Sequence, residues 1–189
     1  MRVLPGTEAP ELYFARMAEY YLHTNAQFGP YAARFLSTKF FTEMPERVRQ
    51  WVWFAAAHED SKVKNGEVAA PELAPPEDPI ALSMLVVKND RLIGRYWGAR
   101  RTIKDLHFNT CYYTPIEWAI ENGITIFDPG MGSPHKLRRG FRAVPNWSLH
   151  YFFDPDMRWI LETNMDRINA YEESYIQSLD EAVPYKKKA

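Results

Sequence analysis

The sequence contains a single cysteine, and this scarcity removes two common ways of stabilising a small domain. Cys111 has no second cysteine with which to form an internal disulfide and no partner cysteines for a zinc site. No apolar run approaches the roughly 20 residues that a membrane helix needs, and the first residues lack the apolar core of a signal peptide. We therefore expect a cytoplasmic protein without a membrane span that is stabilised by packing.

The composition is typical of one soluble globular domain. A chain of 189 residues can bury one sizeable core. Hydrophobic residues make up 46%, charged residues 25% and aromatic residues 15%, which excludes a disordered chain.

The net charge of −1 conceals an uneven distribution. Between Lys88 and Arg142, ten Lys or Arg residues stand against five Asp or Glu residues, so this segment carries +5 and the remainder −6. Such an imbalance favours an anionic ligand, for example a phosphate, a nucleotide or an RNA backbone. A solvated basic face without a ligand gives the same pattern.

Hydrophobic periodicity predicts helices and a meander in the first half of the chain. Helices are expected from Pro10 to about Thr24 and over Tyr31–Met44, with Pro45 just beyond the second. Three apolar runs follow, and a short polar turn separates the last two, which predicts an antiparallel meander. The expected strands are Arg49–His58, Ile80–Val87 and Arg91–Trp97, and a proline-rich extended or mobile loop occupies 59–79.

The second half is expected to alternate between helix and strand. A helix between Leu106 and Asn122 either starts with Pro115 at its first position or is kinked there. The strand–helix–strand order around it implies that the short apolar strand Ile124–Phe127 pairs in parallel. A short helix, His135–Phe141, and a strand, Ser148–Phe153, follow.

A long amphipathic helix is expected over Pro155–Leu179, covering the domain's own core or docking a partner. The fold class is thus α/β in the α+β sense, with a mixed, mostly antiparallel sheet flanked by helices. We divide the chain into a domain over 1–154, the C-terminal helix over 155–180 and a basic tail over 181–189.

The segment Asp128–Gly140 could bind an anion. A strand that ends in a carboxylate and passes through glycines into a helix start brings free backbone N–H groups to the positive end of a helix dipole. Ser133 is a suitable N-cap, while Lys136 and Arg139 lie three residues apart on one helix face. A capped helix with a basic exterior explains the same residues, and the spacing matches neither a Walker loop nor the dinucleotide fingerprint.

Two histidines are candidate general bases, since an imidazole titrates near neutral pH. His107 and His135 are each also explained by a structural role. Cys111 lies four residues after His107, so a nucleophilic thiolate is one interpretation and a small buried side chain the other. A metal site built from the two histidines lacks a third ligand.

Several motifs in fixed order resemble one bacterial family. They are GRYWG at Gly94–Gly98, LHF and CYY within Leu106–Tyr113, the IEWAIE segment, and HK followed by RGF within His135–Phe141. They are similar to the peptidoglycan biosynthesis or recognition proteins, which are FemAB-like and belong to the GNAT-fold acyltransferase superfamily. The similarity extends over about Tyr13–Asp154 and resembles the carboxyl-terminal half of longer members.

This resemblance implies a GNAT-like fold and transfer of an acyl or aminoacyl group from an activated carrier to an amine of a cell-wall precursor or another small acceptor. It implies no tightly bound cofactor, with acyl-CoA or aminoacyl-tRNA as co-substrate. His135 or His107 would be the catalytic base. Residues beside the carrier would be Tyr96, Trp97, Arg100, Arg101 and Lys104, and residues that bind the acceptor or anion would be Asp128, Lys136 and Arg139.

Two further functions stay open from the sequence. One is a noncatalytic module that recognises an anionic muropeptide, or one half of a two-chain transferase that pairs with an amino-half protein or a second copy. The other is an RNA-binding protein that uses the basic segment and its aromatic residues, for which steep salt dependence is expected.

Overall fold

The computed structural model describes residues 1–32, 35–59, 78–131 and 134–185. The chain divides into two compact units, Met1–Gly130 and Met131–Ala189. We call them the sheet unit and the C-terminal unit and describe each by itself.

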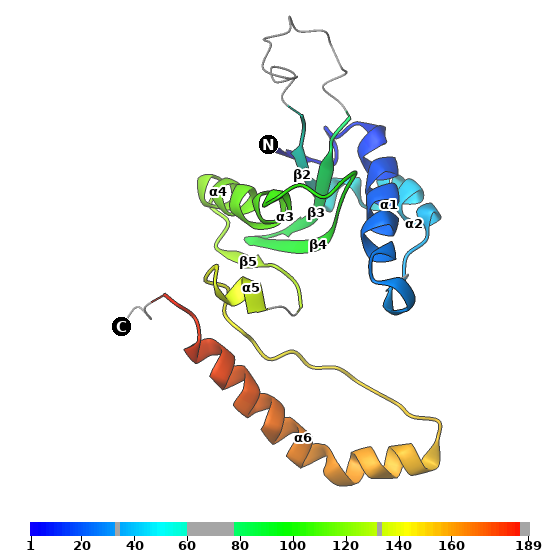
Figure 1. Ribbon diagram of the computed structural model, residues 1–189, viewed down its shortest axis with the longest axis vertical. Helices are drawn as coiled ribbons and strands as arrows, with labels where there is room; N and C mark the ends of the chain where they lie inside the picture. The colour runs from blue at the N-terminus through cyan, green and yellow to red at the C-terminus, as the bar shows by residue number, and fades with distance from the viewer. Residues whose placement is uncertain (33–34, 60–77, 132–133, 186–189) are drawn as a thin grey trace, which may run out of the picture. The chain divides into compact units, whose positions relative to one another are not determined.

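The sheet unit is built on five strands in the order β1-β2-β3-β4-β5 (Figure 1). Neighbouring strands are antiparallel from β1 to β4, and β5 pairs with β4 in parallel. The predicted meander, parallel strand and mixed sheet are therefore confirmed. The strands are β1 (Arg2–Pro5), β2 (Val52–Ala57), β3 (Ala81–Lys88), β4 (Arg91–Ala99) and β5 (Ile126–Asp128).

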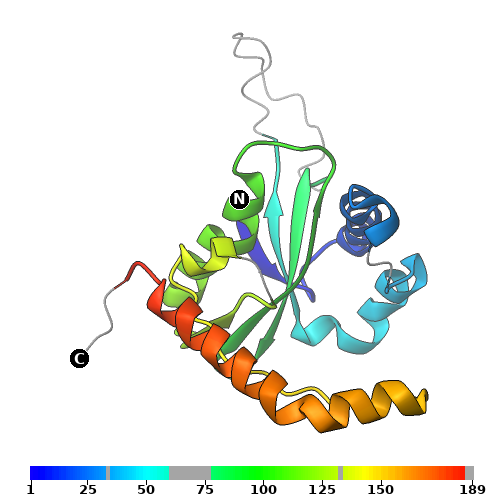
Figure 2. The same ribbon diagram turned by 60° about the horizontal axis from the view of Figure 1, so that its bottom comes forward.

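Helices cover both faces of this sheet (Figures 1 and 2). On one face, α1 (Glu11–Ala26) and α2 (Thr38–Val48) pack on side chains such as Phe54, Leu82 and Met84. On the other face, α4 (Thr114–Glu121) packs on Ala55, Leu85 and Leu92. Because helices cover both faces, β2 and β3 are buried on both sides. Successive side chains of a strand point to opposite faces, so both sets must be apolar, which explains the continuous apolar sequences of β2 and β3.

The second helix differs from the prediction. A 3-10 helix covers Gly29–Tyr31, and α2 begins only at Thr38, where the backbone N–H of Phe40 donates to the Ser37 hydroxyl. This cap fixes the start. Pro45 does not stop the helix, which continues to Val48 because its apolar face is buried through Phe41 and Met44. Tertiary packing here outweighs a lost backbone hydrogen bond.

The helical segment after β4 contains a wide turn before its proline. It runs as α3 (Leu106–Phe108), a π-helix (Asn109–Tyr113) and α4, with Pro115 in the first turn of α4. Pro115 has no N–H and its ring would crowd the carbonyl of Cys111 in a regular helix. The π-helical turn accommodates it. One alternative predicted a helix start at Pro115 and the other an irregular helix there, and each holds in part.

A very close contact between α1 and the sheet lies at Gly98 of β4. A Cβ atom added to Gly98 would lie 2.4 Å from the backbone carbon and oxygen of Tyr20. The Tyr20 hydroxyl in turn donates to the Pro79 carbonyl over 2.5 Å. Only a glycine permits this close approach of helix and strand.

Charged groups also connect α1 with the end of β4. Arg16 of α1 donates to Asp78 over 2.8 Å, and Arg100, just after β4, donates to the other carboxylate oxygen over 2.5 Å. The hydrogen bond from Arg16 lowers the pKa of Asp78, and Arg100 lowers it further. Asp78 therefore links α1 to the end of β4.

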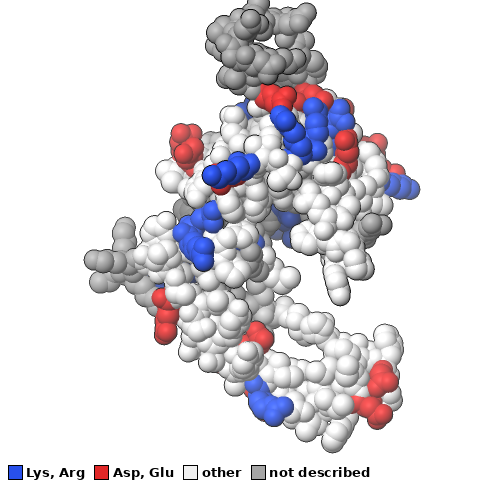
Figure 3. Space-filling model, in the orientation of Figure 1, with Lys and Arg blue, Asp and Glu red and all other residues white. Residues whose placement is uncertain are grey.

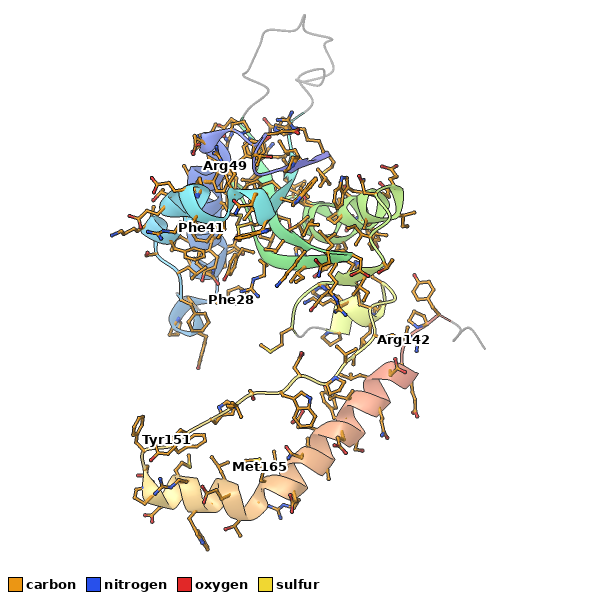
Figure 4. The ribbon with its side chains drawn as sticks, turned by 180° about the vertical axis from the view of Figure 1, so that it is seen from behind. Phe28, Phe41, Arg49, Arg142, Tyr151 and Met165 are labelled. Atoms are coloured by element: carbon orange, nitrogen blue, oxygen red, sulfur yellow. The ribbon has the colours of Figure 1, made fainter. Side chains whose placement is uncertain are left out.

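The C-terminal unit consists of α5 (Pro134–Leu137), an extended segment and the 27-residue α6 (Pro155–Glu181). In Figure 4 the extended segment, with Tyr151, runs beside α6, with Met165. The Arg158 guanidinium lies 5.6 Å from the centre of the Tyr151 ring and donates to its hydroxyl over 3.0 Å. Asp154 caps α6 by accepting from the N–H of Met157.

One prediction in this unit is wrong, and another gives a helix with the wrong end. Residues 148–153 form no strand, because an extended aromatic segment needs a strand edge to pair with, and here it runs beside a helix whose backbone bonds internally. The helix expected over His135–Phe141 ends at Leu137, before Gly140 takes a positive φ of 87°.

The predicted long C-terminal helix is confirmed, and none of its residues is buried. Whether it covers the core or docks a partner stays a prediction. No helix among the described residues has the length and apolar character to cross a membrane. The proline-rich segment lies, apart from its ends, outside the described residues, as does the end of the basic tail.

Replacing Gly98 by alanine should destabilise the protein by about 1–3 kcal/mol, because the new methyl group overlaps the backbone of Tyr20. Thermal unfolding followed by circular dichroism measures the loss. Gly94→Ala is the matched control in the same strand, since its Cβ would lie 3.5 Å from the nearest atom. Equal melting temperatures for Gly98→Ala and the unmodified protein would contradict the contact.

Asp78→Asn should lower the free energy of unfolding by about 1 kcal/mol at pH 7, since partly exposed ion pairs contribute modestly. The folded pKa of Asp78 is lowered, so its contribution is complete above the ordinary carboxyl pKa of about 3.9 and disappears as the pH falls through the lower folded value. Urea unfolding between pH 7 and pH 2.5 should show the two proteins converging in acid. Glu43→Gln, which removes an exposed 3.5 Å pair with Lys39, should have little effect at any pH.

Candidate functional site

A β-bulge interrupts β4 at the centre of the sheet unit. Met84 pairs with Tyr96 and Leu85 pairs with Gly94, so Arg95 is one extra residue opposite β3. In a regular strand, neighbouring side chains point to opposite faces. The bulge instead lets Arg95 and Tyr96 line the same cavity, on the face covered by α2.

The strands β4 and β5 pair over only three residues. The register runs from Arg91 and Ile126 to Ile93 and Asp128, whereas β4 continues to Ala99. Pro129 stays close to Gly94, with 3.5 Å between its Cα and a Cβ placed on the glycine. After Ile93, no described residue pairs with the outer edge of β4. We call this short unpaired strand edge beside the bulge the free edge of β4.

Tyr96 and Trp97, both predicted beside a carrier, lie on opposite faces of the sheet. Tyr96 packs against Tyr21 and Phe41 on the α1 and α2 face, with ring centres 5.5 and 5.8 Å apart. Trp97 lies on the α3 face, where its ring centre is 4.8 Å from that of His107. The two side chains therefore flank the free edge of β4 from its two sides.

His107 sits in an aromatic environment at the start of the helical segment. Besides Trp97, the rings of Phe108 and Tyr112 lie with their centres 5.3 and 5.5 Å from its own. Its side chain is half-buried. The structure thus brings one predicted base next to one predicted carrier residue. Cys111, one helical turn later, is buried and is not part of a disulfide.

A cavity of about 410 Å³ opens between α2 and the sheet. Its walls come from α2, the 3-10 helix Arg49–Trp51 and strands β2, β3 and β4. The lining residues are Phe40, Glu43, Met44, Arg47, Val48, Trp51, Val52, Met84, Val86, Arg95 and Tyr96. The volume lies within the range of about 300–1,000 Å³ typical of small-molecule sites.

The basic turn predicted to face phosphates is largely engaged in ion pairs. Arg100 pairs with Asp78, and Arg101 pairs with Glu59. Figure 3 shows acidic and basic side chains intermixed beside the grey segment. Lys104 is exposed and forms no ion pair with any described residue. An anion here would have to displace carboxylates from the two arginines.

The predicted anion site divides between the two units. Asp128, in the sheet unit, accepts the N–H of Gly130 over 2.8 Å. In the C-terminal unit, Lys136 donates to the Met131 carbonyl over 2.9 Å and Arg139 donates to the His135 carbonyl over 2.7 Å. Gly132 and Ser133 lie outside the described residues. Both cationic side chains thus stabilise the short α5 turn itself.

His135 has the electrostatic character of a base. Burial lowers the pKa of its imidazole, and the positive charges of Arg139 and Lys136 lower it further. The ring is therefore neutral at pH 7 and can accept a proton. No group of three metal-ligating side chains occurs among residues 1–32, 35–59, 78–131 and 134–185.

Sequence reasoning missed the cavity. Its residues come from five separate elements, and Arg47 and Val48 lie beyond the predicted end of the second helix. One local signal was present, since Arg95 is a cation inside an otherwise apolar and aromatic strand.

Comparison with known proteins gives one family. No curated protein and no solved structure matches the chain significantly. The family model described as FemAB-like, peptidoglycan biosynthesis/recognition, matches residues 1–187, almost the whole chain. This match includes the bulge, the helical segment after it and both units. The chain is therefore a member of this FemAB-like family.

Proposed function

We propose that this protein transfers an acyl or aminoacyl group from an activated carrier to an amine of a cell-wall precursor. Membership of a peptidoglycan biosynthesis/recognition family supports the class of acceptor. The observation that supports transfer is the free edge of β4 beside the bulge, where β5 has departed.

This edge suits an extended carrier such as the arm of acyl-CoA or the aminoacyl end of a tRNA. A strand edge offers backbone N–H and C=O groups to an extended ligand. N–H groups at the bulge can stabilise the oxyanion that forms when an amine attacks the acyl carbon. Tyr96 and Trp97 border the edge on either side.

The reaction needs one proton acceptor. The amine nitrogen bonds to the acyl carbon, the bond from that carbon to the carrier's sulfur or oxygen breaks, and the carrier leaves as a thiol or hydroxyl after taking up a proton. A neutral imidazole takes the amine proton. His107 is the candidate in the sheet unit and His135 the candidate in the C-terminal unit.

Substituting the base should lower the transfer rate about 10²- to 10⁴-fold. We expect this loss in either His107→Gln or His135→Gln, measured with acyl-CoA or aminoacyl-tRNA and a nucleotide-linked muropeptide. If His135 is the base, the midpoint of the fall in rate toward acid pH should lie below the ordinary imidazole pKa of about 6.5, because its folded pKa is lowered. Full activity in both variants would exclude both residues.

A recognition module without turnover is the second candidate function. The specific observation that favours it is the engagement of Arg100 and Arg101 by carboxylates, which leaves the turn after β4 poorly prepared for carrier phosphates. Melting curves separate the two functions, since a ligand that binds only the folded state raises the melting temperature. Stabilisation by the muropeptide, with none by either carrier and no product, would establish recognition and contradict transfer.

A further inference from the structure

We propose that the cavity between α2 and the sheet binds an amphipathic anion, meaning an apolar chain or ring that carries a carboxylate or phosphate group. This site goes beyond the proposed transfer reaction and does not depend on it.

The interior of the cavity is apolar. Met44, Val52 and Met84 form buried parts of its wall. At its margin two large aromatic side chains remain exposed, Trp51 by 51% and Phe40 by 42%. Removing such apolar surface from water is favourable. An apolar chain or ring in the cavity would cover it.

The rim carries an excess of positive charge. Arg47 of α2 and Arg95 of β4 line the cavity from different walls, and neither forms an ion pair with any described residue. The one carboxylate on the rim, Glu43, pairs with Lys39 over 3.5 Å. Two guanidinium groups beside an apolar interior favour a carboxylate or phosphate, which arginine can bind through two parallel hydrogen bonds.

The position of Arg95 is a consequence of the bulge. Its guanidinium carbon lies 5.4 Å from the centre of the Tyr96 ring, and its Nη2 donates to the Tyr96 hydroxyl over 3.4 Å. The aromatic face thus holds the cation at the rim. Tyr96 is itself fixed by Phe41 and Tyr21.

The same lining argues against a sugar or a nucleobase. Among the described residues that form the cavity, Tyr96 supplies the one hydroxyl, and there is no Asn, Gln, Ser or Thr. Sugars and bases need several placed donors and acceptors for recognition. The chemistry present is apolar contact together with cationic charge.

Four probes of equal chain length separate charge from apolar contact: octanoate, octyl phosphate, octanol and octylamine, each used below its micelle concentration. We expect octanoate and octyl phosphate to raise the melting temperature most, octanol less and octylamine least. Acetate, which carries the charge without the chain, should have no effect. Calorimetric titration of octanoate then gives the dissociation constant for each variant.

Charge-changing variants should alter octanoate binding in opposite directions. Arg47→Gln and Arg95→Gln should each weaken it about 3- to 10-fold, in keeping with partly exposed charged hydrogen bonds. Glu43→Gln should strengthen it. Arg91→Gln, at the exposed start of β4 and outside the cavity, is the matched control and should bind as the unmodified protein does.

A filling variant tests the location. Val86 is half-buried and lines the cavity, so Val86→Phe should reduce binding of all chain-bearing probes. If circular dichroism shows that Val86→Phe does not fold, the octanoate affinities of Arg47→Gln and Arg95→Gln test the proposal instead. Equal binding of octanoate and octanol, no melting shift with any probe, or unchanged octanoate affinity in both Arg47→Gln and Arg95→Gln would overturn the proposal.

Discussion

The close approach of α1 to β4 at Gly98 is the constraint on which the sheet unit depends. Because the strand carries no side chain there, the backbone of Tyr20 lies directly on it, and the buried face of α1 covers that end of the sheet. α2 covers the adjoining part near the bulge. The shorter helix buries only Phe41 and Met44, so a cavity remains beneath it.

Much of the fold was predictable because its signals are local. The signals are the continuous apolar runs of β2 and β3, the apolar run of β4 and the periodic apolar residues of α1 and α6. The start of the predicted strand Arg49–His58 is wrong, since Arg49–Trp51 forms a 3-10 helix. The strand β1 was missed because four residues containing a proline give no periodicity. The segment 148–153 has strand-like composition, but a strand exists only where a second edge pairs with it. Composition cannot supply that edge.

The candidate site was less predictable because its chemistry depends on distant partners. Asp78 lies 22 residues from Arg100, and Glu59 lies 42 residues from Arg101, so no sequence window shows that these cations are paired. Neighbours in sequence also separate in space, as Tyr96 and Trp97 do across the sheet. Charge counting located the basic turn correctly and could not show what its charges contact.

The bulge connects the fold to both proposed sites. One extra residue in β4 turns Arg95 toward the α2 side together with Tyr96, while Trp97 remains on the side of His107. Without the bulge, Arg95 would alternate away from Tyr96, and the cavity would lose a cation. The same irregularity lies where β5 leaves β4. The segment Gly94–Gly98 therefore specifies backbone geometry first, and Gly98 at its end permits the close contact with Tyr20.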